Sequence, residues 1–243
     1  MKRGLPSFFT SLGLISGCIS IVFSIAYGNL TLAGYFILIA AFFDFIDGFT
    51  ARMVNAISDF GKQLDSLADV VSFGVAPSMI IYQIIELAFV QSSTSFDKYN
   101  PTTGQHIILF SSFILAVFSA LRLAKFNLDP GQSKSFRGLP VPANAIFFAG
   151  IGFIVESNVW LSHQIVSSVW ILLALVVLFS YLQVSNIRMF SLKFSSYGFK
   201  ANAVQYLFLL VSAVLLVLFH LPALSPIIVL YVLVSVVTIG KNK

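Results

Sequence analysis

The chain has 243 residues, of which 58% are hydrophobic and only 9% are charged. Soluble domains carry about 25% charged residues, so this composition excludes an ordinary soluble protein and predicts an integral membrane protein. The formal net charge is +5. Basic residues at helix ends suit an anionic membrane surface or an anionic substrate, and nothing here predicts nucleic acid as a partner.

Apolar segments long enough to cross a bilayer recur through the chain. A transmembrane helix needs about 20 apolar residues. We therefore predict an all-α fold, a polytopic membrane helix bundle of about eight transmembrane helices, with residues 1–243 as one membrane domain. The expected helices cover residues 8–28, 31–55, 63–91, 105–127, 142–156, 165–186, 202–220 and 222–240, of which the last two, at about 202–240, are additional C-terminal helices. Pro77 lies within the third of these segments, where we expect it to bend the helix.

The distribution of lysine and arginine predicts the topology. With an even number of helices, 13 of the 14 basic residues fall on one side of the membrane, and only Lys98 falls on the other. Basic residues favour the cytoplasmic side. We therefore expect both termini, and the acidic motif described next, to face the cytoplasm.

Acidic residues gather in one short part of the chain. Of nine acidic residues in all, five lie between Asp44 and Asp69. Two helical stripes account for four of these five, since each set of residues recurs at helical spacing. The first stripe is Asp44, Asp47, Gly48 and Ala51, and the second is Gly61, Asp65, Asp69 and Ser72. Asp59 lies off both stripes, and we expect it to cap a helix.

Two neighbouring helices that turn these stripes toward each other would bring four carboxylates together. Such a cluster predicts Mg²⁺ or Mn²⁺, with two ions able to clamp a phosphoryl group between attacking and leaving oxygens. A single aspartate near a helix end could instead pair with a basic side chain and reach the interface. That alternative explains four regularly spaced aspartates poorly, because only Arg52 and Lys62 lie nearby.

The pattern D-x-x-D-G-x-x-A-R-x8-G-x-x-x-D-x-x-x-D, which runs from Asp44 to Asp69, resembles the motif of the CDP-alcohol phosphotransferases. The resemblance implies a six-helix catalytic core, often in a homodimer. It also implies a reaction in which an alcohol hydroxyl attacks the phosphorus of a CDP-linked lipid and releases CMP. We accordingly expect a multi-pass protein of a bacterial or archaeal cell membrane.

The resemblance also implies roles for the motif residues. Asp44, Asp47 and Asp65 match metal ligands, and Asp69 matches the general base, which also touches metal in this reading. Three small residues match positions that line the CMP site: Gly48, Ala51 and Gly61. Arg52 matches an arginine that lies near phosphate or holds an aspartate in place. A carboxylate within hydrogen-bond reach can take the proton of an attacking alcohol, which agrees with the role of Asp69.

Three further segments indicate the acceptor. Residues 59–77, 121–127 and 136–142 resemble the membrane-bound phosphatidylserine synthases of this family. That resemblance implies CDP-diacylglycerol and L-serine as substrates, although Lys125 replaces an expected arginine and Val141 an expected small polar residue. Basic side chains in these segments could hold the lipid phosphate or the serine carboxylate: Arg122, Lys125 and Arg137. They could instead anchor the protein to anionic lipid.

Two other functions stay open from the sequence alone. The same chemistry could use another acceptor, such as glycerol 3-phosphate or inositol. A cation transporter would use the aspartates differently, since it needs acidic residues along a path through the bilayer with access from both sides. The clustering at one face favours the transferase.

Overall fold

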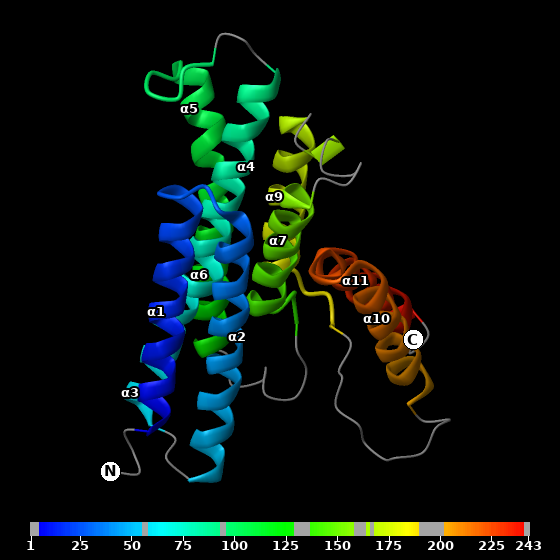
Figure 1. Ribbon diagram of the computed structural model, residues 1–243. Helices are drawn as coiled ribbons and strands as arrows, with labels where there is room; N and C mark the ends of the chain where they lie inside the picture. The colour runs from blue at the N-terminus through cyan, green and yellow to red at the C-terminus, as the bar shows by residue number, and fades with distance from the viewer. Residues whose placement is uncertain are drawn as a thin grey trace.

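The computed structural model describes residues 5–54, 58–92, 96–128, 137–157, 164–165, 168–189 and 202–240. Within these ranges the chain is helical, with no β-strand (Figure 1). The helices are α1 (Leu5–Ile25), α2 (Leu30–Met53), α3 (Asp59–Asp69), the π-helix η1 (Val70–Val75), α4 (Ala76–Ser92), α5 (Thr103–Phe110), the 3-10 helix η2 (Ser111–Phe113), α6 (Ile114–Leu128), α7 (Val141–Glu156), α9 (Val169–Val184), α10 (Ala203–Phe219), the 3-10 helix η4 (Leu221–Ala223) and α11 (Leu224–Gly240).

Several of these elements join end to end into longer helices. The runs α3–η1–α4, α5–η2–α6 and η4–α11 are continuous, so the described residues form eight helical segments. Their ends lie within four residues of the predicted ones, which confirms the all-α, eight-helix prediction. Five segments are long and apolar enough to cross a membrane: Leu5–Ile25, Leu30–Met53, Asp59–Gln91, Thr103–Leu128 and Leu221–Thr238. The apolar helices α7, α9 and α10 are shorter, with 16 or 17 residues each.

Helix α1 has small and polar residues on its buried face and large apolar residues on its exposed face. Its buried face consists entirely of small or polar residues: Pro6, Thr10, Gly13, Ser16, Gly17, Ser20 and Ser24. Large side chains such as Phe8, Ile15 and Val22 are exposed instead. Small residues let neighbouring backbones approach closely where lipid removes the hydrophobic drive to pack. The stripe therefore explains the extensive packing of α1 on α2.

The turn into α2 is fixed by three local features. Gly28 has φ +61°, a conformation that favours glycine. Asn29 then caps the helix, because its Oδ1 accepts a hydrogen bond from the Leu32 amide at 2.7 Å. Glu156, from the end of α7, accepts hydrogen bonds from the backbone amides of Leu30 and Thr31. A carboxylate is well placed there, since a helix N-terminus carries partial positive charge, and it ties α7 to α2.

A π-helical turn lies directly before Pro77, where a bend was expected. Pro77 has no backbone N–H, so the carbonyl of Phe73 cannot receive the usual bond from the residue four positions ahead. The chain widens instead over Val70–Val75, and the Ala76 amide bonds to the carbonyl of Val71. This rare turn begins immediately after Asp69, and such turns occur frequently at functional sites.

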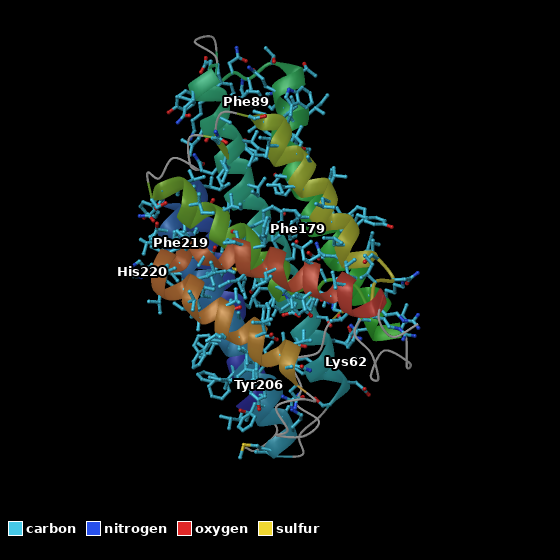
Figure 2. All side chains as sticks on the ribbon, turned by 90° about the vertical axis from the view of Figure 1, so that its right-hand side faces the viewer. Lys62, Phe89, Phe179, Tyr206, Phe219 and His220 are labelled. Carbon is cyan, nitrogen blue, oxygen red and sulfur yellow. The ribbon has the colours of Figure 1, made fainter. Side chains whose placement is uncertain are left out.

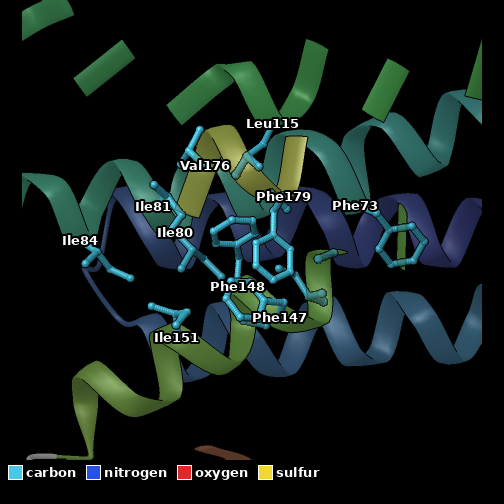
Figure 3. Packing of buried hydrophobic residues seen from close by; sticks show 14 of the residues in the cluster. Phe73, Ile80, Ile81, Ile84, Leu115, Phe147, Phe148, Ile151, Val176 and Phe179 are labelled. Carbon is cyan, nitrogen blue, oxygen red and sulfur yellow. The ribbon is translucent and has the colours of Figure 1, made fainter. Parts of the chain in front are cut away.

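Helix α7 occupies the centre of the bundle and packs against α2, α4 and α11. Aromatic rings fill the space between α7 and α9: Phe147 stacks on Phe179 with ring centroids 3.7 Å apart, and Phe148 meets Phe179 edge-on (Figure 3). Figure 2 shows α10 and α11 as a hairpin that runs obliquely across the side of the bundle. Helix α11 covers one face of α7 there.

Candidate active site at the ends of α2, α3 and α6

Three aspartates from the two stripes meet in space. Asp44 and Asp47 come from α2 and Asp65 from α3, and one carboxylate oxygen of each lies within 4.8 Å of the others. Asp47 is buried, while Asp44 and Asp65 are partly exposed. Helix α1 packs against both α2 and α3 and so holds the two stripes together. Hard divalent cations take oxygen ligands at such spacing, and this group could hold a metal ion.

Asp69 shares a pocket with the three clustered aspartates. The residues that line this pocket are Thr10, Gly13, Ala40, Asp44, Asp47, Asp65, Ala68, Asp69, Ser72 and Phe73. The Asp69 carboxylate interacts electrostatically with all three of the other carboxylates and with the Arg122 guanidinium. The fourth aspartate of the motif therefore belongs to the acidic site and also lies near Arg122 of α6.

Thr10 is a site residue that the sequence interpretation missed. Its buried hydroxyl lies 2.6 Å from Oδ2 of Asp47 and can donate a hydrogen bond to it. From η1, Ser72 donates to the backbone carbonyl of Gly13 at 3.1 Å, which fixes η1 against α1 at the wall of the pocket. The small-residue stripe of α1 could have indicated Thr10. After Pro6, Thr10 is the residue of that stripe nearest the expected cytoplasmic end, where the aspartates lie.

The small motif residues differ in their surroundings. A Cβ added at Gly48 would meet nothing within 4 Å, so open space lies beside this residue of α2. A Cβ at Gly61 would come within 3.1 Å of Ser58 Oγ. Ala51 is partly buried, and Arg52 is exposed in the last turn of α2.

The expected cap at Asp59 is displaced by one residue. Ser58 caps α3, because its hydroxyl accepts a hydrogen bond from the Gly61 amide at 3.1 Å. Asp59 is instead the first helical residue, where its negative charge suits the helix N-terminus. Serine and aspartate both favour this turn, so sequence alone could not decide between adjacent positions.

The three basic candidates near the second segment separate in the structure. Arg122 is partly buried and interacts electrostatically with Asp69. Lys125 and Arg137 are exposed, and the backbone of Arg137 forms an isolated antiparallel bridge with Arg188. Of the three, Arg122 is the one with an interaction described with a carboxylate of the site.

Helix α6 is also attached to α3 beside the motif. The Asn127 side chain donates to Ser66 Oγ at 2.8 Å. Lys62 Nζ lies 3.4 Å from the Asn127 carbonyl oxygen. These contacts hold the end of α6 next to the helix that carries Asp65 and Asp69, so Arg122 and the carboxylates keep their relative positions.

Comparison with known proteins agrees with this geometry. The family model for CDP-alcohol phosphatidyltransferase matches residues 3–181. The chain therefore belongs to the CDP-alcohol phosphatidyltransferase family, as the motif indicated.

Three individual relatives show which enzymes of this family the chain is similar to. The CDP-diacylglycerol–serine O-phosphatidyltransferase of Bacillus subtilis is 35% identical over 153 residues, which cover 63% of this chain and 75% of that protein. The enzyme of the same name from Helicobacter pylori is 31% identical over 206 residues, covering 84% of this chain and 79% of the relative. An archaetidylserine synthase from Methanothermobacter thermautotrophicus is 38% identical over 144 residues, covering 58% and 54%.

Proposed function

We propose that this protein transfers the phosphatidyl group of CDP-diacylglycerol to the hydroxyl of L-serine, giving phosphatidylserine and CMP. The observation that carries the proposal is the convergence of Asp44, Asp47 and Asp65, with Asp69 in the same pocket, in a chain of this family. The Bacillus subtilis and Helicobacter pylori relatives, named for this reaction, support serine as the acceptor.

The carboxylates would hold the metal. In this proposal Asp44, Asp47 and Asp65 bind Mg²⁺ or Mn²⁺, and Asp69 supplies a further oxygen if two ions bind together. When bound, the cations would neutralise charge on the phosphoryl oxygens and on departing CMP. The Thr10 hydroxyl fixes one oxygen of Asp47, which orients this ligand from the adjacent helix.

Asp69 would act as the general base. As the serine hydroxyl oxygen forms its bond to the phosphorus that carries the diacylglycerol, Asp69 takes the hydroxyl proton. The bond from that phosphorus to the oxygen of CMP breaks, and CMP leaves as a phosphate monoester. The positive charge of Arg122, beside Asp69, would attract either the lipid phosphate or the serine carboxylate into position.

The nucleotide would occupy the space beside the small residues. We propose that Gly48, Ala51 and Gly61 line the CMP site, with Arg52 near the phosphates. The open space at Gly48 supports this assignment, because a glycine leaves room beside the helix that carries Asp44 and Asp47.

We also propose the membrane arrangement that the sequence predicts. The pocket and both termini would face the cytoplasm, the lipid would enter sideways from the bilayer, and two copies would form a homodimer. Residues 1–243 would act as one membrane domain, which the packing of α11 on α7 supports. Cysteine-labelling of an Asp59→Cys variant in right-side-out and inverted vesicles tests the orientation, since labelling only from the outside would contradict it.

The test of function is CMP release by the purified protein. We expect release with CDP-diacylglycerol and Mn²⁺ that depends on L-serine, stops on chelation of the metal, and yields phosphatidylserine. Glycerol 3-phosphate and inositol serve as competing acceptors. Release with one of these instead would replace the acceptor, and no release from folded protein with any acceptor would overturn the transferase assignment.

A further inference from the structure

A group of buried polar atoms lies outside the pocket of the carboxylates. Within the described part of the chain, no hydrogen-bond partner exists for both amide atoms of Asn144, Nε2 of Gln183, Oγ of Ser180 and Nε of Arg122. Asn144 is 0% exposed, and Ser180 and Gln183 are each 1% exposed. Buried polar groups are almost always hydrogen-bonded, so several orphans together indicate a missing partner.

These side chains come from three helices and lie around one contact between α6 and α9. Ser119 of α6 donates to Oε1 of Gln183 on α9 at 2.9 Å, which joins those two helices. Ser180 lies one turn before Gln183 and Arg122 one turn after Ser119. Residues spaced by three positions share a helix face. Ser180 and Gln183 therefore share one face of α9, as Ser119 and Arg122 share one face of α6.

Two contacts between α7 and α9 place Asn144 at the same level. Below it, the Leu139 amide donates to the carbonyl of Leu182 at 2.9 Å. Above it, Phe147 stacks on Phe179 (Figure 3). The two helices are antiparallel, so Asn144 falls between these contacts, opposite the last turn of α9. We call Ser119, Arg122, Asn144, Ser180 and Gln183 the polar layer.

The polar layer adjoins the reacting groups through Arg122. The guanidinium interacts with the Asp69 carboxylate, which lines the pocket of the acidic cluster. All members of the layer lie in the last three turns of α6, the last two turns of α9 or the first turn of α7. The end of α6 is attached to α3 by the hydrogen bond from Asn127 to Ser66. Arg122 is therefore the member of the layer that connects it to the proposed general base.

The free atoms of the layer match an α-amino acid. Gln183 Nε2, Ser180 Oγ and Arg122 Nε are donors, as a carboxylate requires, and Arg122 adds a positive charge. Asn144 offers an acceptor oxygen for an ammonium group and a further donor. We propose that the polar layer binds the carboxylate and ammonium groups of the acceptor amino acid and directs its hydroxyl toward Asp69. The inference rests on the proposed function, and it assigns acceptor specificity to Asn144 and Gln183.

The layer is closed to solvent in this structure, and binding of the acceptor would open it at the helix ends. Gln183 is the penultimate residue of α9, and Asn144 is the fourth of α7, so a small separation of these ends suffices. An amino acid that enters would then supply the partners that the buried amides lack. Binding would therefore remove the free-energy cost of burying these polar groups without hydrogen-bond partners.

Near-isosteric substitutions test the inference. Gln183→Glu keeps the acceptor for Ser119 but replaces two donors with negative charge, which repels a carboxylate. Asn144→Leu removes both amide atoms at similar volume. We expect each variant to raise the KM for L-serine at least tenfold, with the KM for CDP-diacylglycerol unchanged. Gln83→Glu is the matched control, because Gln83 is also buried but lies in α4, 14 residues beyond Asp69.

The controls separate this inference from the proposed function. Serine-dependent release by the wild type, with an unchanged KM for L-serine in both variants, would overturn the inference and leave the function standing. A lower kcat and a lower melting temperature in both variants, with no change in the KM for L-serine, would also overturn the inference. Such a result would show that the polar layer has only a structural role.

Titration of L-serine into the protein with CMP and Mn²⁺ supplies a readout that needs no turnover. Binding by the wild type that is lost in Gln183→Glu supports the inference even if CMP release fails. Absence of binding overturns it. Ethanolamine lacks the carboxylate and 3-hydroxypropionate lacks the ammonium group, so each should bind more weakly than L-serine. Equal binding of either compound would contradict the assignment.

Discussion

Asp69 is the side chain on which the proposed chemistry depends most. Asp69→Asn keeps the size of the group but removes its ability to take a proton. We expect kcat to fall about 100-fold to 10,000-fold, the usual contribution of a general base. Binding of CMP should survive in part, because the clustered aspartates and Gly48 remain. Steady-state CMP release and CMP titration measure the two effects.

Asp59→Asn is the matched control for that variant. Asp59 is exposed in the first turn of α3 and does not line the pocket. The control should retain full turnover with at most a small loss of stability. Full turnover in Asp69→Asn would remove this residue as the base, whatever the control shows.

Thr10 is expected to act through Asp47. Thr10→Val removes the hydroxyl that lies 2.6 Å from the carboxylate and leaves a side chain of the same shape. Groups that orient a metal ligand usually affect metal affinity by about 10-fold to 100-fold. The Mn²⁺ concentration for half-maximal activity should rise by that amount. Thr10→Ser restores the hydroxyl and should return this concentration toward the wild-type value; a Ser variant as impaired as Val would refute the hydrogen-bond role.

Some of these side chains could be predicted from the sequence and others could not. Asp44, Asp47 and Asp65 are costly groups at regular helical spacing in an apolar chain, so the sequence alone could predict that they form one site. Thr10 and Asn144 carry no such cost in the sequence. Their roles depend on which helix packs beside them, and periodicity within one helix does not contain that information.

Between helices, two glycines of α1 should respond differently to the same change. A Cβ at Gly17 would lie 2.7 Å from Ser72 Cα, a backbone atom that could move away only if η1 shifted. A Cβ at Gly13 would find ordinary contacts at 3.6 Å. Overpacking of this kind costs about 1–3 kcal/mol. Gly17→Ala should therefore lower the melting temperature clearly more than Gly13→Ala, as measured by thermal denaturation in detergent; equal effects would contradict the tight contact of α1 with η1.

The extent of each helix was more predictable than its internal form. Bilayer thickness sets the length of apolar runs, so hydropathy located eight segments with ends within four residues. The π-helical turn at Val70–Val75 was not predicted. It depends on the backbone hydrogen bond that Pro77 cannot donate and on the packing of this turn against α1 and α6. The cap at Ser58 was missed by one residue because two good capping residues are adjacent.

For the chain taken together, the order of the helices was predictable but their neighbours were not. Nothing in the apolar run 142–156 indicated that α7 would lie at the centre, contacting α2, α4 and α11. In lipid, large apolar residues fit equally well inside and outside, so hydrophobicity does not reveal the buried face. The small residues of α7, such as Gly150 against Ser225 of α11, are the better indicator.

The short length of α9, on which Trp170, Val177 and Tyr181 are exposed, has a consequence for the surrounding bilayer. The 16 residues of α9 rise about 24 Å, less than the roughly 30 Å thickness of the hydrocarbon core. Such hydrophobic mismatch is relieved by local thinning of the bilayer, at a cost for each ångström. Thinning beside the pocket would lower the headgroup of an arriving lipid toward the carboxylates. Turnover in vesicles should thus fall as acyl chains lengthen from about 14 to about 22 carbons, and turnover independent of chain length would show that the helices adapt without deforming the membrane.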